Sequence, residues 1–415
     1  MTENFNGNNG QVGLTRSISP GQLILYGLGT TLGAGVYVVI GEIIGASGAW
    51  APLSFALASL VAALTGASFA ELTGRAPSSG GPVAWVAEAF GEGWMPIAVG
   101  WGIVAAGVVS AATVATGFVS YLGVFVDWSK WWILPVLVGV PTIVASVGIK
   151  QSAWFMAATT LAGLAGIVII LVMTAGNIPD WPKVIERENI AFGSGAMLSG
   201  ILLGGFLAFY AFIGFEDIAH LAEEVKDVER SIPCAIFVTL IVSMAIYVTV
   251  ALAAVTTLPI AALAESSTPL VDMLGDAGIA IPIVVLLSLM TIADGLLAQI
   301  IMASRTIHDL GERRKGAPAI ISKISARTKT PVVATVICGG GVVTLALFYP
   351  TGTLASITSG IVLSVFVIAN FALIVLKRRN AAPKKVFHAP IWVPYAGAIS
   401  SLGLLAVQIF STGSK

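Results

Sequence analysis

Long apolar stretches separated by short polar segments dominate the chain, and their lengths are those of membrane-spanning helices. A helix that crosses a bilayer needs about 20 predominantly apolar residues. This pattern predicts eleven spans, Gly21–Ile44, Pro52–Phe69, Met95–Val124, Trp132–Val147, Ala153–Ala175, Ala196–Leu221, Cys234–Thr256, Ile279–Ala303, Pro331–Phe348, Leu354–Leu376 and Ile391–Phe410. The sequence therefore predicts an all-α polytopic membrane protein.

The first predicted span carries four glycines within nine residues, Gly27, Gly29, Gly33 and Gly35. Each glycine costs about 1 kcal/mol relative to alanine in a helix. A break inside a bilayer is tolerated only where the freed backbone groups face a cavity or a ligand. The alternative interpretation is close packing of helices through small residues.

A second interruption is predicted in the sixth span, at Phe209–Glu216, where Gly214 and an acidic residue lie inside an apolar stretch. An ionisable side chain at such a depth is costly and marks a functional site by default. Breaks in spans one and six occupy corresponding positions of two five-helix halves. Because five is odd, the second half enters the membrane from the opposite side. This arrangement predicts a 5+5 inverted-repeat transporter fold with discontinuous first and sixth helices and a midplane site.

Basic residues are distributed unequally between the two sides of the predicted membrane. With the N-terminus inside, 17 of the 21 Lys and Arg residues lie on the inner side, which predicts a cytoplasmic N-terminus in a multi-pass protein of the cell (inner) membrane. We expect a disordered cytoplasmic tail over 1–18 and a transporter core over 19–380. The core comprises repeats at about 19–176 and 195–377, and an additional C-terminal transmembrane helix covers 386–415.

Composition agrees with this class, since 57% of the residues are hydrophobic and 10% are charged, against roughly 25% charged in soluble domains. The net charge of zero gives no indication of a nucleic-acid partner. The two cysteines imply neither a disulfide framework nor a metal site. No Ser/His/Asp grouping, HExxH motif or P-loop occurs, so the sequence predicts neither an enzyme nor a cofactor.

Four parts of the chain resemble one known family. Leu32–Tyr37 is similar to a first-span motif Ile-Gly-x-Gly-Ile-Phe, and Phe69–Leu72 with Ser78–Pro82 is similar to the loop after span two. The third part resembles the sixth-span signature and its exit loop, and comprises Ala211–Glu216, Ala222–Lys226 and Ile232–Ile236. The fourth part is Ala303–Gly311, which resembles the end of span eight. Together they resemble the amino acid–polyamine–organocation superfamily, most closely amino acid permeases of the cationic amino acid transporter type. That family usually has twelve spans.

The resemblance and physical chemistry indicate the same substrate site. Unwinding at Ala34 and Gly35 would expose N–H groups at a helix N-terminus, which favours a substrate carboxylate. Carbonyl groups freed in the two breaks would accept hydrogen bonds from the substrate ammonium. The predicted substrate-binding residues are Thr31, Gly33, Ala34, Gly35, Tyr210, Ala211, Phe212, Ile213 and Gly214. Tyr210 and Phe212 are candidate gate aromatics, with helix packing as the alternative.

Four polar residues are candidates for coupling or gating: Glu216, Asp294, Thr159 and Thr160. Glu216 either links protonation to movement, as the resemblance implies, or caps the second half of span six. Asp294 is either a proton or cation site or a neutral acid bonded to a neighbouring helix. Many proton-linked family members carry a lysine where this chain has Gly163. We therefore hypothesise that Asp294 and the threonines replace that lysine, through a proton or a sodium ion near Asp294.

The sequence predicts a secondary active amino acid transporter that works by alternating access. The segment Val108–Ala112 and Leu296, expected to face the substrate side chain, carry no charge, which favours neutral amino acids with H⁺ or Na⁺ coupling. Two alternatives stay open, namely an amino acid or polyamine exchanger and a non-transporting amino acid sensor on the same scaffold. The expected partners are the amino acid, the coupling cation and the lipid bilayer.

Overall fold

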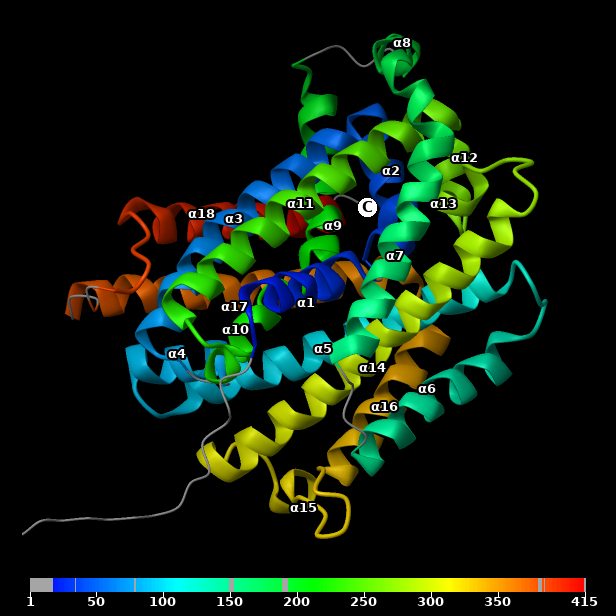
Figure 1. Cartoon of the computed structure of the whole chain (residues 1–415). Helices are drawn as coiled ribbons and strands as arrows, with labels where there is room; N and C mark the ends of the chain where they lie inside the picture. Colours follow the sequence, from blue (N-terminus) through cyan, green and yellow to red (C-terminus); the bar gives the residue numbers. More distant parts are fainter. Residues whose placement is uncertain are drawn as a thin grey trace, which may run out of the picture.

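The computed structural model describes residues 18–33, 35–77, 80–148, 153–188, 193–379, 383 and 385–413, and Figure 1 shows that these residues are built from helices. Their extended pairing is limited to an isolated bridge between Ile18 and Val225. Of the tail predicted over 1–18, residues 1–17 lie outside the described residues, as does Ala34, while Ile18 forms the bridge.

The helices of the first part of the chain are α1 (Pro20–Leu32), α2 (Gly35–Ser47), η1 (Gly48–Trp50), α3 (Ala51–Arg75), α4 (Gly81–Phe90), α5 (Trp94–Leu122), α6 (Lys130–Val147), α7 (Ala153–Thr174), η2 (Ala175–Asp180) and α8 (Trp181–Glu188). The second part contains α9 (Gly195–Phe212), α10 (Asp217–His220), η3 (Ala222–Glu224), α11 (Val228–Thr257), α12 (Ile260–Glu265), α13 (Pro269–Asp272), α14 (Ala280–Arg314), α15 (Ala319–Ser322), α16 (Val332–Phe348), α17 (Thr351–Arg379) and α18 (Trp392–Gly413).

Nine helical runs among the described residues are long and apolar enough to cross a membrane, and α16 is apolar but shorter. One of the nine, Gly35–Arg75, contains both α2 and α3. It therefore holds the later part of the first predicted span and all of the second. With α1 and α2 taken as one interrupted span and α16 included, these helices account for the eleven predicted spans.

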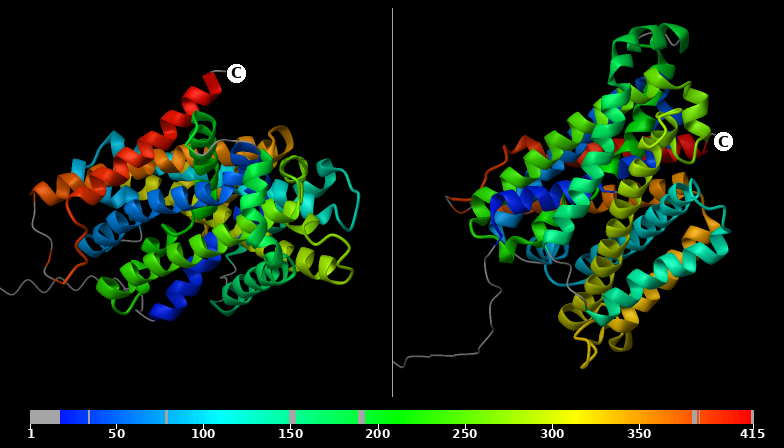
Figure 2. Two further views of the ribbon diagram at one scale, coloured as in Figure 1. Left: turned by 90° about the horizontal axis from the view of Figure 1, so that it is seen from above. Right: turned by 45° about the vertical axis from the view of Figure 1, so that its right-hand side comes forward.

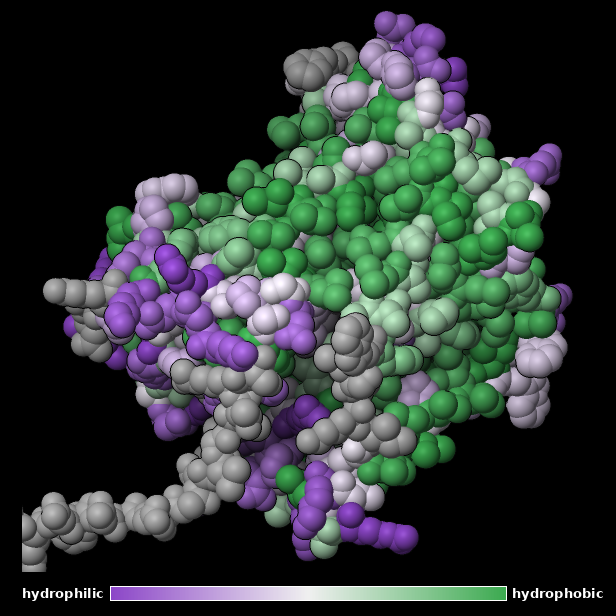
Figure 3. All heavy atoms as spheres, in the orientation of Figure 1, coloured by the Kyte–Doolittle hydropathy of each residue, from purple (hydrophilic) through white to green (hydrophobic). Residues whose placement is uncertain are grey.

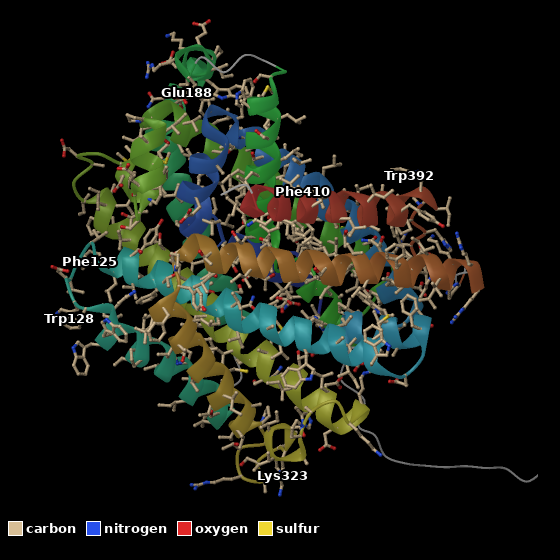
Figure 4. All side chains as sticks on the ribbon, turned by 180° about the vertical axis from the view of Figure 1, so that it is seen from behind. Phe125, Trp128, Glu188, Lys323, Trp392 and Phe410 are labelled. Carbon is tan, nitrogen blue, oxygen red and sulfur yellow. The ribbon has the colours of Figure 1, made fainter. Side chains whose placement is uncertain are left out.

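The surface is that of a membrane protein. Figure 3 shows apolar residues gathered in a broad band across the middle of this face, with hydrophilic residues at its lower left and along its upper and right-hand edges. Glu188, at the end of α8, and Lys323, just after α15, lie at opposite ends of the molecule in Figure 4. The band between these ends is where the long helices present apolar side chains to lipid.

The helix ends follow local sequence. Ser19 begins α1 with a capping box, because its hydroxyl accepts from the Gln22 N–H at 3.4 Å while the Gln22 side chain accepts from the Ser19 N–H at 3.0 Å. Pro20 follows at the first helical position. At the other end of the interrupted span, η1 and Pro52 lead the chain directly into α3.

The packing brings α1, α2 and α9 to the centre of the bundle. The helix α1 contacts α11 and α7, and α2 contacts α9 (Figure 1). On one side α5 packs along α14 and α17, and on the other α3 packs along α9 and α11. The two further views in Figure 2 show α18 lying across the outside of this bundle. Both interrupted helices are therefore enclosed by others.

A buried carboxylate joins α3, α17 and the segment before α18. Glu71 in α3 is inaccessible to solvent and pairs with Lys377 Nζ in α17 at 2.6 Å and with Arg75 Nη2 at 2.8 Å. The Glu71 oxygen that pairs with Lys377 also accepts from the Ala389 N–H at 2.8 Å. Lys377 in turn donates to the Ala389 carbonyl at 2.7 Å. Both the backbone N–H and the backbone carbonyl of Ala389 are thus hydrogen-bonded, which anchors the additional helix α18 to the core.

Candidate substrate and cation site

The interruptions of the first and sixth spans touch one another. The Thr30 hydroxyl donates to the Gly214 carbonyl oxygen at 3.0 Å, and a Cβ atom on Gly214 would lie 2.6 Å from the Thr30 carbonyl oxygen. Gly214 has φ of +121°, a conformation that favours glycine. Gly35 is equally close to the other break, since a Cβ there would lie 2.8 Å from the Ala211 Cα. Because residues 35 and 214 are glycines, the backbones of the first and second breaks can contact each other directly.

The first predicted break is confirmed. Helix α1 ends at Leu32, Gly33 departs from helical geometry with φ of −55° and ψ of −92°, and α2 begins at Gly35. Because α2 starts here, its first N–H groups have no partner within the helix. Ala34 itself, predicted to bind substrate, lies outside the described residues.

The second break is also confirmed. Helix α9 ends at Phe212, Ile213 is extended, and the chain turns through Gly214 to Glu216. The second half of span six, predicted to end at Leu221, is the four-residue helix α10, Asp217–His220, followed by a turn.

Two freed carbonyl groups in the breaks already share a donor. The Tyr247 hydroxyl, in α11, donates to the Thr31 carbonyl at 2.6 Å and to the Ala211 carbonyl at 2.9 Å. Its side chain is completely buried. Each carbonyl oxygen has a second lone pair, so both can still accept from a substrate ammonium. Tyr247 thus joins the two breaks from a third helix.

The sequence analysis missed Tyr247. The available signal was its spacing, because Thr239, Ser243 and Tyr247 recur every four residues and so share one face of α11. All three are buried, and a phenol hydroxyl within an apolar span needs a hydrogen-bond partner. That face therefore had to meet a polar part of another helix.

The two candidate gate aromatics occupy different positions. The hydroxyl group of Tyr210 lies 3.2 Å from Ser110 Oγ in α5 and donates to the Ser110 carbonyl at 3.3 Å. Phe212 is fully buried and packs edge-on against Tyr247, with ring centroids 5.2 Å apart. The geometry of Phe212 is that of a packing residue, whereas Tyr210 reaches across the bundle to α5.

A cavity extends from the second break toward α4 and α10. Its lining includes Ile103, Ala106, Gly107 and Ser110 of α5, Ile213, Glu216, Asp217 and His220 near α10, Gln299 and Met302 of α14, and Thr358, Val362 and Phe366 of α17. On the opposite side of the breaks, the α2 residues Val36, Tyr37, Val39 and Ile40 are fully buried. The cavity therefore lies on the α4 and α10 side of the breaks.

Glu216 lies at the cavity but does not cap α10 with its side chain. Its carboxylate instead accepts the Gly214 N–H at 2.8 Å. The predicted capping role is therefore replaced by a bond that stabilises the turn of the second break. This contact links the Glu216 carboxylate directly to the backbone of Gly214.

Asp294 meets one of the two predicted threonines. The Thr159 hydroxyl in α7 donates to Asp294 Oδ2 in α14 at 2.7 Å, and the Thr291 hydroxyl donates to the Thr159 carbonyl at 3.1 Å. The Thr160 hydroxyl donates to the Met156 carbonyl at 2.8 Å, and its side chain faces Gly29 of α1. Thr159 therefore contacts Asp294 directly, whereas Thr160 packs against α1.

The side chains around Asp294 present oxygen atoms that could act as cation ligands. Within the described part of the chain there is no cluster of three or more His, Cys, Asp or Glu side chains that could hold a metal ion. A carboxylate with hydroxyl groups beside the end of α1 suits a hard cation such as Na⁺, or a proton shared through hydrogen bonds.

The comparisons with known proteins agree with this architecture. The model of the "Amino acid permease" family matches residues 18–415. A vacuolar cationic amino acid transporter of Arabidopsis thaliana is 29% identical over 89% of this chain and 64% of its own length. A methylthioribose transporter of Bacillus subtilis is 27% identical over 94% of this chain and 87% of its own. This chain thus spans less than two thirds of the plant relative.

A solved structure of a Na⁺-coupled sialic acid symporter superimposes with a TM-score of 0.62, covering 94% of this chain and 90% of that one at 10% identity. That likeness shows the fold, the inverted-repeat arrangement with interrupted first and sixth spans. The chain belongs to the amino acid permease family of the amino acid–polyamine–organocation superfamily. Its described helices are long and apolar enough for a multi-pass membrane protein, as the sequence predicted.

Proposed function

We propose that this protein is a secondary active transporter that carries a neutral amino acid by alternating access. The observation that carries the proposal is the contact between the two breaks, which combines the free N–H groups at the start of α2 with the Thr31 and Ala211 carbonyls. Donors and acceptors at one place complement the carboxylate and ammonium of an α-amino acid. The proposed site is formed by most of the predicted residues, Thr31, Gly33, Ala34, Gly35, Tyr210, Ala211, Ile213 and Gly214, while Phe212 packs against Tyr247.

The cavity beside the break supports an uncharged substrate side chain. Most of its wall is apolar or weakly polar, with Ile213, Met302 and Phe366 among the larger side chains. Of its acids, Glu216 is turned toward the Gly214 N–H. The larger apolar side chains of the wall favour an amino acid with an aliphatic side chain, and the carboxylates of Glu216 and Asp217 are the part of the wall that a cationic side chain would use instead.

The group around Asp294 supports coupling to a cation. Asp294, Thr159 and Thr291 link α14 to α7 beside the end of α1, because a Cβ on Gly33 would lie 3.9 Å from the Thr291 methyl. We infer that Asp294 takes up H⁺ or Na⁺ with the substrate. Neutralising this carboxylate changes the contact between α7 and α14, and therefore the packing of α1.

The distribution of basic residues supports a cytoplasmic N-terminus in the cell membrane. In this orientation the α4 and α10 side faces the cytoplasm and α2 faces outward. The cavity then opens inward, and the buried α2 covers the outer approach to the site.

Two measurements test the proposal. A thermal-shift screen of purified protein with the proteinogenic amino acids and polyamines should identify neutral amino acids as stabilising ligands, since a ligand at 100 times its Kd stabilises by about 2.7 kcal/mol. Uptake of the best ligand into proteoliposomes should then respond to an imposed Na⁺ or pH gradient. Binding without uptake or counterflow would make the protein a sensor, and stabilisation by polyamines alone would contradict the substrate class.

A further inference from the structure

Tyr37, in the first turn of α2, makes a contact that the substrate site does not require. Its hydroxyl donates to the Gly163 carbonyl of α7 at 2.7 Å, and the side chain is fully buried. The first-span motif has phenylalanine at this position, so the hydroxyl is an addition to the pattern.

Two glycines of α7 leave room for side chains of the neighbouring helices α2 and α14. Gly163 and Gly166 share one face of the helix, and a Cβ on Gly166 would lie 2.7 Å from the Tyr37 hydroxyl. A Cβ on Gly163 would lie 2.8 Å from the Thr291 hydroxyl of α14. The phenol therefore fits against α7 because Gly166 has no side chain, while Gly163 makes room for Thr291 of α14.

A second tyrosine extends the link to α5. The Tyr121 hydroxyl donates to the Tyr37 carbonyl at 3.1 Å, and the two rings pack edge-on with centroids 6.0 Å apart. One residue later, Val38 packs into the space left by Gly117 of α5, where a Cβ would lie 2.9 Å from Val38 Cγ1. Tyr37 is thus hydrogen-bonded to both α7 and α5, and the next residue packs on α5.

We propose that Tyr37, supported by Tyr121, is a latch that holds α2 closed over the outward side of the substrate site. When α2 moves away from α5 and α7, both hydrogen bonds break and Val38 leaves Gly117. Tyr37 acts through the position of α2 and is a positioning residue. The inference rests on the proposed alternating access and on the outward position of α2.

The test uses two reporter cysteines and a thiol reagent on the purified full chain. Val38→Cys reports exposure of the α2 face that packs on α5, and Met302→Cys reports the cavity on the opposite side of the breaks. Labelling of the chain without either reporter is subtracted to account for Cys234 and Cys338. Each reporter is measured in wild type, Tyr37→Phe, Tyr121→Phe and the control Tyr349→Phe, whose ring is 48% exposed.

We expect Tyr37→Phe and Tyr121→Phe to label Val38→Cys about threefold faster, since an interhelical hydrogen bond in a membrane contributes modestly. Labelling of Met302→Cys should stay equal or become slower, and Tyr349→Phe should change neither. Equal Val38→Cys labelling in Tyr37→Phe and the control would overturn the latch, as would faster labelling of both reporters together, which indicates general loosening. No substrate is needed, so an incorrect substrate class would not produce either contradicting result.

Discussion

Thr30 and Gly214 are 184 residues apart in sequence, yet the hydroxyl of one donates to the carbonyl of the other at 3.0 Å. This bond joins the interruptions of the first and sixth spans at the centre of the bundle. Both interruptions expose backbone groups, and each is tolerated because the other interruption and Tyr247 supply polar neighbours.

Gly214→Ala should reduce uptake by at least about tenfold, because a side chain at φ of +121° is strained by about 2 kcal/mol and its Cβ would lie 2.6 Å from the Thr30 carbonyl oxygen. Proteoliposome uptake measures the effect. Gly360→Ala in α17 is the matched control, since no atom lies within 4 Å of a Cβ there. Normal uptake by Gly214→Ala would show that the two breaks need not touch.

Tyr247→Phe should lower the free energy of unfolding by about 1 kcal/mol and raise KM about fivefold, because the Thr31 and Ala211 carbonyls lose their shared donor. Thermal unfolding and initial uptake rates give the two values. Tyr349→Phe provides the control for removal of a phenol hydroxyl. A stability loss with unchanged KM would make Tyr247 a packing residue alone.

Asp294→Asn should abolish the response of uptake to imposed H⁺ and Na⁺ gradients while leaving exchange of internal for external substrate intact. The amide keeps the shape and can still accept from Thr159, but it does not take up a proton and is a weaker ligand for a cation. Glu42→Gln, which alters an exposed acid on α2, should retain the gradient response. If uptake by the Asp294→Asn variant responds to the imposed gradients as strongly as uptake by wild type, Asp294 is not the coupling residue.

Glu71→Gln should destabilise the protein by about 3 kcal/mol, since it leaves the buried Lys377 and Arg75 without their anion. Glu92→Gln, at an acid that is 72% exposed in its pair with Arg314, should change stability by less than about 1 kcal/mol. Melting temperatures of the two variants provide the comparison. Equal melting temperatures would remove the argument that Glu71 anchors α18.

The local pattern predicted the positions of the spans and of both breaks, because apolar length and glycine clustering are properties of consecutive residues. The pairing of Asp294 with Thr159 was also anticipated, since both lie at mid-span. Tyr247, Tyr37 and Glu71 were not assigned their partners, because those contacts depend on the rotation of each helix about its axis.

The most direct test of the central claim compares a stabilising amino acid with its two one-sided analogues, the amine that lacks the carboxylate and the acid that lacks the amino group. Each is used to compete with labelled amino acid for uptake into proteoliposomes. If the backbone of the two breaks binds both ends of the zwitterion, only the intact amino acid competes, and each analogue is weaker by at least about tenfold. Equal competition by either analogue would contradict recognition by the paired breaks.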